Sequence, residues 1–343
     1  MPIDSAQSID SIDTVRVRGP EDLLTIVPYL LGFHPSDSFV VVGLNDSRVV
    51  LSARADLADM AHPGLAQHLV RTLVRAEARE VVAVVYSDDD VSLEPLRLPW
   101  GSVVAGFGEH AERAGLSFVD ALLLSDGRWW SYCCTDDACC LSQGQRLADA
   151  STPVAAEATL AGLVALPDRA AVAALLEPAP LAEREALRPL IAIEESHAFD
   201  ATLEDRSRRR TRSMVRALFA AARAQDEGRT HGLTAAQLAR YGVALSEDAI
   251  RDSVWMGVDD RRIDGGVLWR GLARGLPTPY DATPLFLIGW SAWRNGNGAL
   301  AIIAAHRAVA SDPQYAPADL LLAAVREGID PRRLPRVRLP RPT

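Results

Sequence analysis

The sequence contains no lysine, so all of its 36 basic residues are arginine. This absence excludes three kinds of chemistry that depend on a lysine amine. A P-loop needs a lysine on the phosphates, a pyridoxal-phosphate enzyme needs a Schiff-base lysine, and a protein kinase needs the lysine that holds the phosphates of its nucleotide. We therefore expect neither a P-loop nucleotide nor pyridoxal phosphate as a cofactor.

Long apolar runs are also missing. Apolar runs such as PLFLIGW at 284–290 are far shorter than the roughly 18 residues that a membrane span needs. The N-terminal stretch MPIDSAQSIDSIDTVRVRGP is polar and acidic, without the charged-then-apolar order of a secretory signal. Cysteine is scarce, with four residues, all between 133 and 140. We expect a cytoplasmic protein with no membrane segment and with reduced thiols.

The balance of charge is acidic, because 36 basic residues against 45 acidic residues give a net charge of −9. This balance argues against a general affinity for nucleic acid or for anionic lipid. The chain has 343 residues, of which 48% are hydrophobic. It is therefore long enough, and apolar enough, for two ordinary domains with buried cores.

The first part of the chain has the period and the turns of β-strands. Segments 38–44 (SFVVVGL) and 48–57 (RVVLSARADL) flank a tight turn and predict an antiparallel hairpin. Segment 80–86 (EVVAVVY) is a continuous apolar run, typical of a strand that is covered on both faces. Helices are predicted at 62–77 and at about 100–114, and a second hairpin is predicted to turn at Asp126 and Gly127. We expect an α/β domain with a mixed sheet of about five strands.

After about residue 145, alanine-rich amphipathic segments replace the strand patterns. Helix starts are predicted at Asp168, at the capping box TAAQ (234–237) and at Ser246, which would cap a helix that runs through Trp255. The thirty-four residues 282–315 have the length of one tetratricopeptide unit. Small residues such as Gly289 fall where its two helices must approach, and neighbouring helices must cover the pair because one unit cannot bury its own apolar face.

These patterns divide the chain into four parts. The predicted parts are a tail at 1–18, an α/β domain at 19–145, an all-helical region at 146–330 that contains one tetratricopeptide-like helix pair, and an Arg/Pro-rich tail at 331–343. Four tryptophans of the helical region are expected to pack between helices, each with a partner for its indole N–H. They are Trp255, Trp269, Trp290 and Trp293.

Four stretches are distinctive: VPYLLGFHPSDSFVVVGL, DGRWWSYCCTDDACC, RDSVW and AWRNGNGALAIIAAHRAVASDP. In these stretches the chain resembles an actinobacterial family known as domain of unknown function 4192, and the likeness runs from about residue 15 to residue 330. The resemblance implies the division into an α/β part and a helical part, and a cytoplasmic actinobacterial origin. It implies no activity, cofactor or catalytic residue.

Polar residues beside the strands suggest an active site. His34 with Asp37, just ahead of a strand, could be a general base with its orienting acid, or could serve only to shape the loop. The acidic run after strand 80–86, together with Asp56, could hold a divalent metal, although adjacent aspartates in an extended loop point in different directions. This run is Asp88, Asp89 and Asp90.

The segment CCTDDACC (133–140) matches the ligand count of a zinc site, but strand alternation opposes that interpretation. In a hairpin that turns at TDDA, successive side chains alternate, so the four thiols would be divided between two faces. Cys134 and Cys139 would then share one face, where they could form a redox pair. Inert thiols are the plain alternative.

A cluster of arginines occurs in EDRSRRRTRSMVR (204–216), on a predicted helix. It is a candidate for binding an anion or a protein partner, or it is an ordinary solvated helix face. No aromatic residues alternate with the arginines, so base stacking has no support. The candidate binding residues are Arg208, Arg209, Arg212 and Arg216.

The leading hypothesis is a cytoplasmic, non-catalytic binding or regulatory protein that meets a protein partner through its helical region. The first alternative is a metal-assisted hydrolase that acts on a phosphorylated or nucleotide-like substrate, with a divalent metal as cofactor and His34, Asp37 and the Asp88–Asp90 loop as its site. The second alternative is a thiol-based redox sensor.

Overall fold

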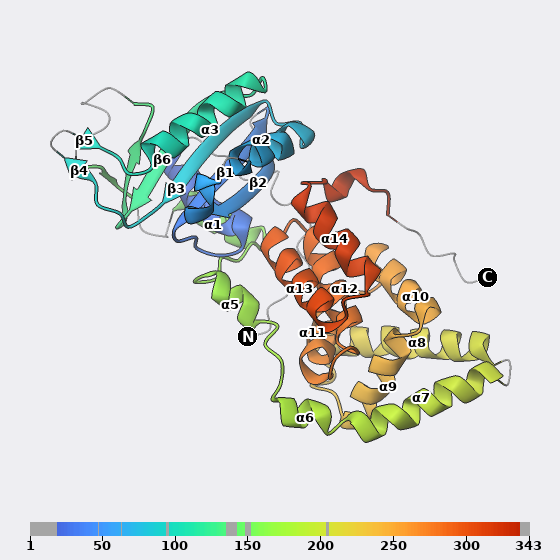
Figure 1. Cartoon of the computed structure of the whole chain (residues 1–343). Helices are drawn as coiled ribbons and strands as arrows, with labels where there is room; N and C mark the ends of the chain where they lie inside the picture. The colour runs from blue at the N-terminus through green and yellow to red at the C-terminus, as the bar shows by residue number, and fades with distance from the viewer. Residues whose placement is uncertain are drawn as a thin grey trace. The chain divides into compact units, whose positions relative to one another are not determined.

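A computed structural model of the chain describes residues 19–46, 48–62, 64–93, 96–134, 143–147, 152–203 and 206–336. The described residues form two compact units. Residues 19–171 and 327–330 make up a sheet unit, and residues 172–326 and 331–336 make up a helical unit. Most helices and strands of both units are labelled in Figure 1. No helix among the described residues is both long and apolar enough to cross a bilayer.

The sheet unit contains a mixed six-stranded sheet with the strand order β2-β1-β3-β6-β7-β8. Its strands are β1 (Ser38–Asn45), β2 (Arg48–Asp56), β3 (Glu80–Tyr86), β6 (Ser117–Ser125), β7 (Arg128–Ser131) and β8 (Gln145–Arg146). The pair β3 and β6 is parallel, and the other neighbouring pairs are antiparallel. Both predicted hairpins are confirmed, and the second turns at Asp126 and Gly127, which both have positive φ.

The continuous apolar run of β3 is explained by helices on both faces of the sheet (Figure 1). On one face, α2 (Leu65–Arg75) and α3 (Gly101–Arg113) share a core with the odd-numbered residues of β3, such as Ala83. On the other face lies α1 (Pro20–Leu31), against which α4 (Pro153–Leu160) packs. Phe107 of α3 lies at the centre of the first core, fully buried.

The sheet unit differs from the prediction in three small features. The sixth strand, β8, has only two residues, too few to show a period in sequence. A separate two-stranded ribbon pairs β4 (Ser92–Leu93) with β5 (Leu96–Arg97), and a short η2 helix spans Ala58–Ala61. An isolated parallel bridge also joins Phe33 to Leu166. By contacts, the described residues divide into two units after Ala171, and α4 belongs to the sheet unit because it packs with α1.

The helical unit contains only helices and loops among its described residues. They are α5 (Arg169–Ala174, which begins at the boundary), α6 (Leu181–Glu185), α7 (Arg188–Leu203), α8 (Ser207–Asp226), α9 (Ala235–Leu245), α10 (Asp248–Asp259), α11 (Gly266–Gly275), α12 (Ala282–Arg294), α13 (Gly298–Ser311), α14 (Ala316–Arg326) and η3 (Pro331–Arg333). The capping box at Thr234 and Gln237 is present. Asp168 also caps its helix, since its carboxylate accepts the N–H of Ala171 at 2.6 Å.

The predicted role of Ser246 is wrong. Ser246 ends α9, and its hydroxyl donates to the carbonyl of Gly242 one turn earlier. The N-cap of α10 is Glu247, whose side chain makes no capping hydrogen bond. A serine between two consecutive helices can serve either of them. Its hydroxyl can donate to a carbonyl of the preceding helix or accept an N–H of the following helix.

Helices α12 and α13 contact each other and are joined by the NGNG turn. A Cβ at Gly289 would lie 3.2 Å from the carbonyl oxygen of Ala301 on α13 and 3.0 Å from Leu321 on α14. Glycine therefore permits the close approach of these helices. Helices α11 and α10 also contact α12, so neighbours cover the pair as expected.

Candidate functional site

Helix α8 has one buried and one exposed face. Its buried residues are Met214, Leu218, Ala222 and Gln225. The four predicted binding residues, Arg208, Arg209, Arg212 and Arg216, are all exposed. Arg208, Arg212 and Arg216 lie one above another, because residues four apart share one face of a helix. This face is opposite the buried residues of α8. We call these four residues the arginine face; its outer two members lie about 12 Å apart along the helix axis.

The arginine face has no bonded partner within the described part of the chain. No ion pair or hydrogen bond joins these four guanidinium groups to any described residue. Arg210, two residues from Arg208, behaves differently. It turns toward the packed side of α8, where its guanidinium binds the Glu247 carboxylate at 2.9 Å and its side chain is only 12% exposed. One helix thus carries a structural arginine beside four that serve no described contact.

The sheet edge brings together several residues predicted for a catalytic or metal site. Ser38 of β1 pairs with both Asp56 of β2 and Tyr86 of β3, so Asp37, Asp56 and the loop after β3 all lie at one edge. Among the described residues, however, no group of three or more His, Cys, Asp or Glu side chains lies close enough to hold a metal ion. The predicted residues share an edge of the sheet without forming a metal centre.

The predicted base and its acid both serve the loop through their backbones. The N–H of His34 donates to the carbonyl of Leu166 at 2.9 Å, and the carbonyl of Asp37 accepts the N–H of Leu57 at 3.0 Å. Both residues are exposed, and Asp37 has a φ of 44°, the left-handed conformation that aspartate adopts in turns. These contacts fit the interpretation of this stretch as loop geometry.

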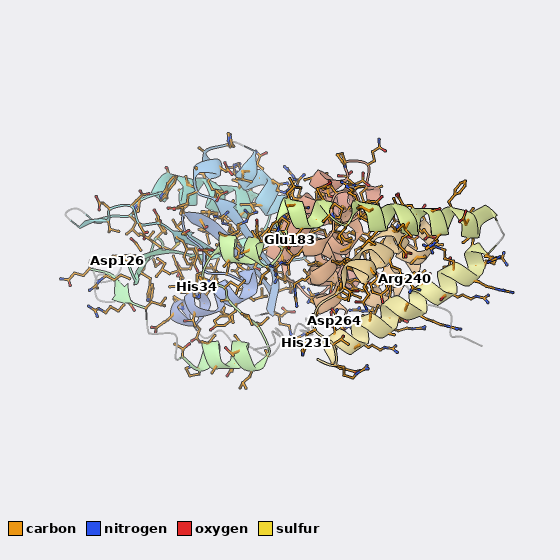
Figure 2. The ribbon with its side chains drawn as sticks, turned by 90° about the horizontal axis from the view of Figure 1, so that it is seen from below. His34, Asp126, Glu183, His231, Arg240 and Asp264 are labelled. Atoms are coloured by element: carbon orange, nitrogen blue, oxygen red, sulfur yellow. The ribbon has the colours of Figure 1, made fainter. Side chains whose placement is uncertain are left out.

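A pocket of about 650 Å³ opens at the ends of β3 and β6, lined in part by Asp88, Asp89, Asp90 and Asp126. Asp89 is held in place, since its carboxylate accepts the indole N–H of Trp100 at 2.6 Å and the hydroxyl of Ser87 at 2.9 Å. His34 and Asp37 do not line this pocket, and Figure 2 shows His34 and Asp126 at separate places on the unit. The pocket therefore lacks the general base that the hydrolase hypothesis assigns to it.

The cysteine segment is described only in part. Strand β7 ends at Ser131, so Cys133 and Cys134 lie beyond the strand and do not alternate across it as predicted. Their backbone N–H groups both donate to the hydroxyl of Ser131, which shapes a turn at this point. Cys133 is a free thiol. Cys139, the other member of the predicted redox pair, lies outside the described residues.

The Cys133 thiol is expected to react slowly in the folded protein. Partial burial of the sulfur, aided by the negative charge of Asp120, raises the pKa of Cys133, so less of it is thiolate at a given pH. In a variant with serine at the other three cysteines, iodoacetamide at pH 8 should modify Cys133 more slowly in the native chain than in urea. Mass spectrometry measures the rate. A faster native rate would favour the sensor hypothesis, and Asp120→Asn should speed the reaction.

The helical unit contains a buried ion pair that was not predicted from the sequence. Arg294 of α12 and Asp259 of α10 have side chains that are 6% and 1% exposed. The guanidinium donates to both carboxylate oxygens, with Nε to Oδ1 at 2.7 Å and Nη2 to Oδ2 at 3.1 Å. The indole N–H of Trp290 donates to the same Oδ1 at 3.0 Å, and the Arg294 guanidinium lies over the rings of Trp290 and Trp293.

This ion pair also holds residues 331–336, which sequence analysis assigned to a tail. The remaining donors of Arg294 reach the carbonyls of Pro331, Leu334 and Pro335, and Arg336 donates to the backbone carbonyl of Asp259 at 2.6 Å. The start of the predicted tail is therefore part of the helical unit. Its residues gave no sign of this in sequence, because backbone carbonyls make the contacts.

The tryptophan expectation is correct for packing and only partly correct for hydrogen bonds. Trp255, Trp290 and Trp293 stack edge to face in series, with ring centroids 4.9 and 5.2 Å apart. Trp269 is fully buried and donates to the carbonyl of Asp264 at 2.9 Å. The indole N–H of Trp255 has no partner among the described residues, contrary to the prediction.

Trp290 links two of the distinctive motifs, since its ring contacts Trp255 of RDSVW and Trp293 of AWRNGNG. The fold is an α/β unit with a mixed sheet followed by a helical unit. The family described as a domain of unknown function, DUF4192, matches residues 20–332, and the chain belongs to this family. No curated protein and no solved structure matches the chain.

Proposed function

We propose that this chain is a cytoplasmic, non-catalytic binding or regulatory protein, whose helical unit engages an acidic protein partner through the arginine face. The observation that carries the proposal is the placement of Arg208, Arg209, Arg212 and Arg216 on one exposed side of α8 with no described partner. The free thiol at Cys133 supports a reducing compartment.

Clustered positive charges lower the stability of helix α8. Like charges four residues apart on a helix destabilise it by about 0.2–0.5 kcal/mol per pair. Arg212 has such a neighbour on each side, at Arg208 and Arg216. Nothing described within the chain offsets this repulsion, whereas an acidic partner would. The arginine face slightly lowers the stability of its own helix. We therefore infer that these arginines serve binding, since they do not help the helix to fold.

The helix pair α12 and α13 adds weaker support. We propose that it is a tetratricopeptide-like pair, on the basis of its 34-residue length and the close approach at Gly289. Units of this kind stack helices and present extended surfaces to other proteins. Actinobacterial origin remains part of the same proposal.

The proposal is tested with an acidic probe. A fluorescein-labelled 12-residue peptide, with four central glutamates between Gly/Ser flanks, should bind the full chain at low salt, as measured by fluorescence anisotropy. Replacing Arg208, Arg209, Arg212 and Arg216 with glutamine should weaken binding at least tenfold, because all four charges of the arginine face are lost.

The matched control removes four exposed arginines from four different elements. They are Arg48 on β2, Arg71 on α2, Arg169 on α5 and Arg240 on α9, the last of which is labelled in Figure 2. The control changes the net charge by the same amount and should bind the peptide nearly as well as the natural chain. Equal losses in the two variants would mean that total charge alone matters, and the proposal would then fail.

A further inference from the structure

We propose that the arginine face recognises a short acidic segment of a polypeptide, with about four carboxylates in succession, and that it does not serve as a track for a long polyanion. This inference rests on the proposed function, since it specifies the partner of the same surface. It follows from the length of the face, from the residues around it and from the charge of the rest of the chain.

The length of the face sets the size of the segment. Arg208, Arg212 and Arg216 recur every four residues, about 6 Å apart, so that the face extends about 12 Å. Four successive residues of an extended polypeptide cover about 13 Å. Each guanidinium can bind one carboxylate through two parallel hydrogen bonds. Side chains on one face of an extended polypeptide recur at every second residue, about 7 Å apart, which is close to the spacing of Arg208, Arg212 and Arg216. A run of about four acidic residues therefore covers most of the arginine face.

The surroundings of the face oppose the binding of a longer anion. Beyond Arg216, the next arginine on this side of α8 is Arg223, which is exposed and donates to the backbone carbonyl of Arg262 at 3.4 Å. Helix α8 then ends in Asp226, which is followed by Glu227, and the whole chain has a net charge of −9. An anion that extends past the end of the helix therefore meets negative charge.

The face also lacks the features that single-stranded nucleic acid uses. Base stacking needs an exposed aromatic ring beside the cationic groups. The aromatic residue of α8, Phe219, is turned toward α10, where its ring occupies the space that a Cβ at Gly257 would need. Ser213, which is exposed between Arg212 and Arg216, and Ala220, which is exposed one turn after Arg216, have no ring. A carboxylate-bearing polypeptide fits this surface better than an oligonucleotide does.

The test compares three labelled probes on the full chain and on the two arginine variants described above. The probes are the peptide with four glutamates, a peptide of twelve glutamates and a 12-nucleotide oligo-dT. We expect the twelve-glutamate peptide to bind no more than threefold tighter than the four-glutamate peptide, and the oligo-dT to bind no tighter than either. All binding should weaken when the arginine face is replaced by glutamine.

Two results separate the possible failures. If the longer peptide or the oligo-dT binds tenfold tighter than the four-glutamate peptide, and that binding is lost with the arginine face, the short-segment inference is overturned while the proposed function stands. If replacing Arg208, Arg209, Arg212 and Arg216 changes none of the three affinities, the inference and the proposed function both fall. Circular dichroism of each variant confirms that its helices are intact.

Discussion

Arg294→Ala should lower the free energy of unfolding by about 3–5 kcal/mol, because it leaves the Asp259 carboxylate buried and unpaired. The same change removes the donors for three backbone carbonyls of residues 331–336 and a stacking partner of Trp290 and Trp293. Urea unfolding followed by tryptophan fluorescence measures the effect. The alanine variant should also lose the spectral environment of these two indoles.

Two further variants show whether the loss comes from the unpaired charge. Arg240→Ala, at an exposed position on α9, should change stability by less than about 0.5 kcal/mol. Replacing both partners, as Asp259→Leu with Arg294→Met, should recover much of the loss, since a buried ion pair often contributes little over apolar residues of similar size. A cost below about 1 kcal/mol for Arg294→Ala would contradict the view that this pair organises the helical unit.

Phe107→Ala should cost a comparable amount, about 3–5 kcal/mol, through the cavity that it leaves in the sheet unit. The ring of Phe107 is fully buried and meets Phe39 of β1 edge to face, with centroids 5.2 Å apart. Phe118 of β6 meets the same ring with centroids 6.0 Å apart. Helix α3 is therefore joined to two separate strands by one side chain.

The control for this prediction lies on the same helix. Glu109 of α3 is exposed and forms a surface ion pair with Arg113 at 3.0 Å, with both side chains more than half exposed. Glu109→Ala should therefore alter stability by less than about 1 kcal/mol. Thermal unfolding followed by circular dichroism compares the two variants. If both fell by the same amount, the core of the sheet unit would not depend on Phe107.

The main elements of the fold could be predicted because their sequence patterns have a simple physical origin. The apolar run of β3 needs cover on both faces, and the turn at Asp126 and Gly127 needs two positive φ values. The short strand β8 could not be predicted, since two residues show no period. Ser246 was misassigned because the same hydroxyl suits a helix end as well as a helix start.

The candidate sites divide in a similar way. The exposure of Arg208 and Arg212 could be foreseen, because a cluster of arginines cannot be buried without partners. The Arg294 network could not, because it joins Arg294 to Asp259, 35 residues away, and to three backbone carbonyls that lie 37, 40 and 41 residues away. A carboxylate and a guanidinium in separate helices give no local signal of their pairing. Only the fold brings them into contact.

The absence of lysine determines how the arginine face responds to acidity. A guanidinium group keeps its positive charge in proteins, whereas a lysine amine can lose its charge when it is buried. Release in acid would come from the partner, whose aspartate and glutamate side chains take up protons near pH 4. Any dependence of complex formation on pH would thus report the chemistry of the ligand, with this surface held constant.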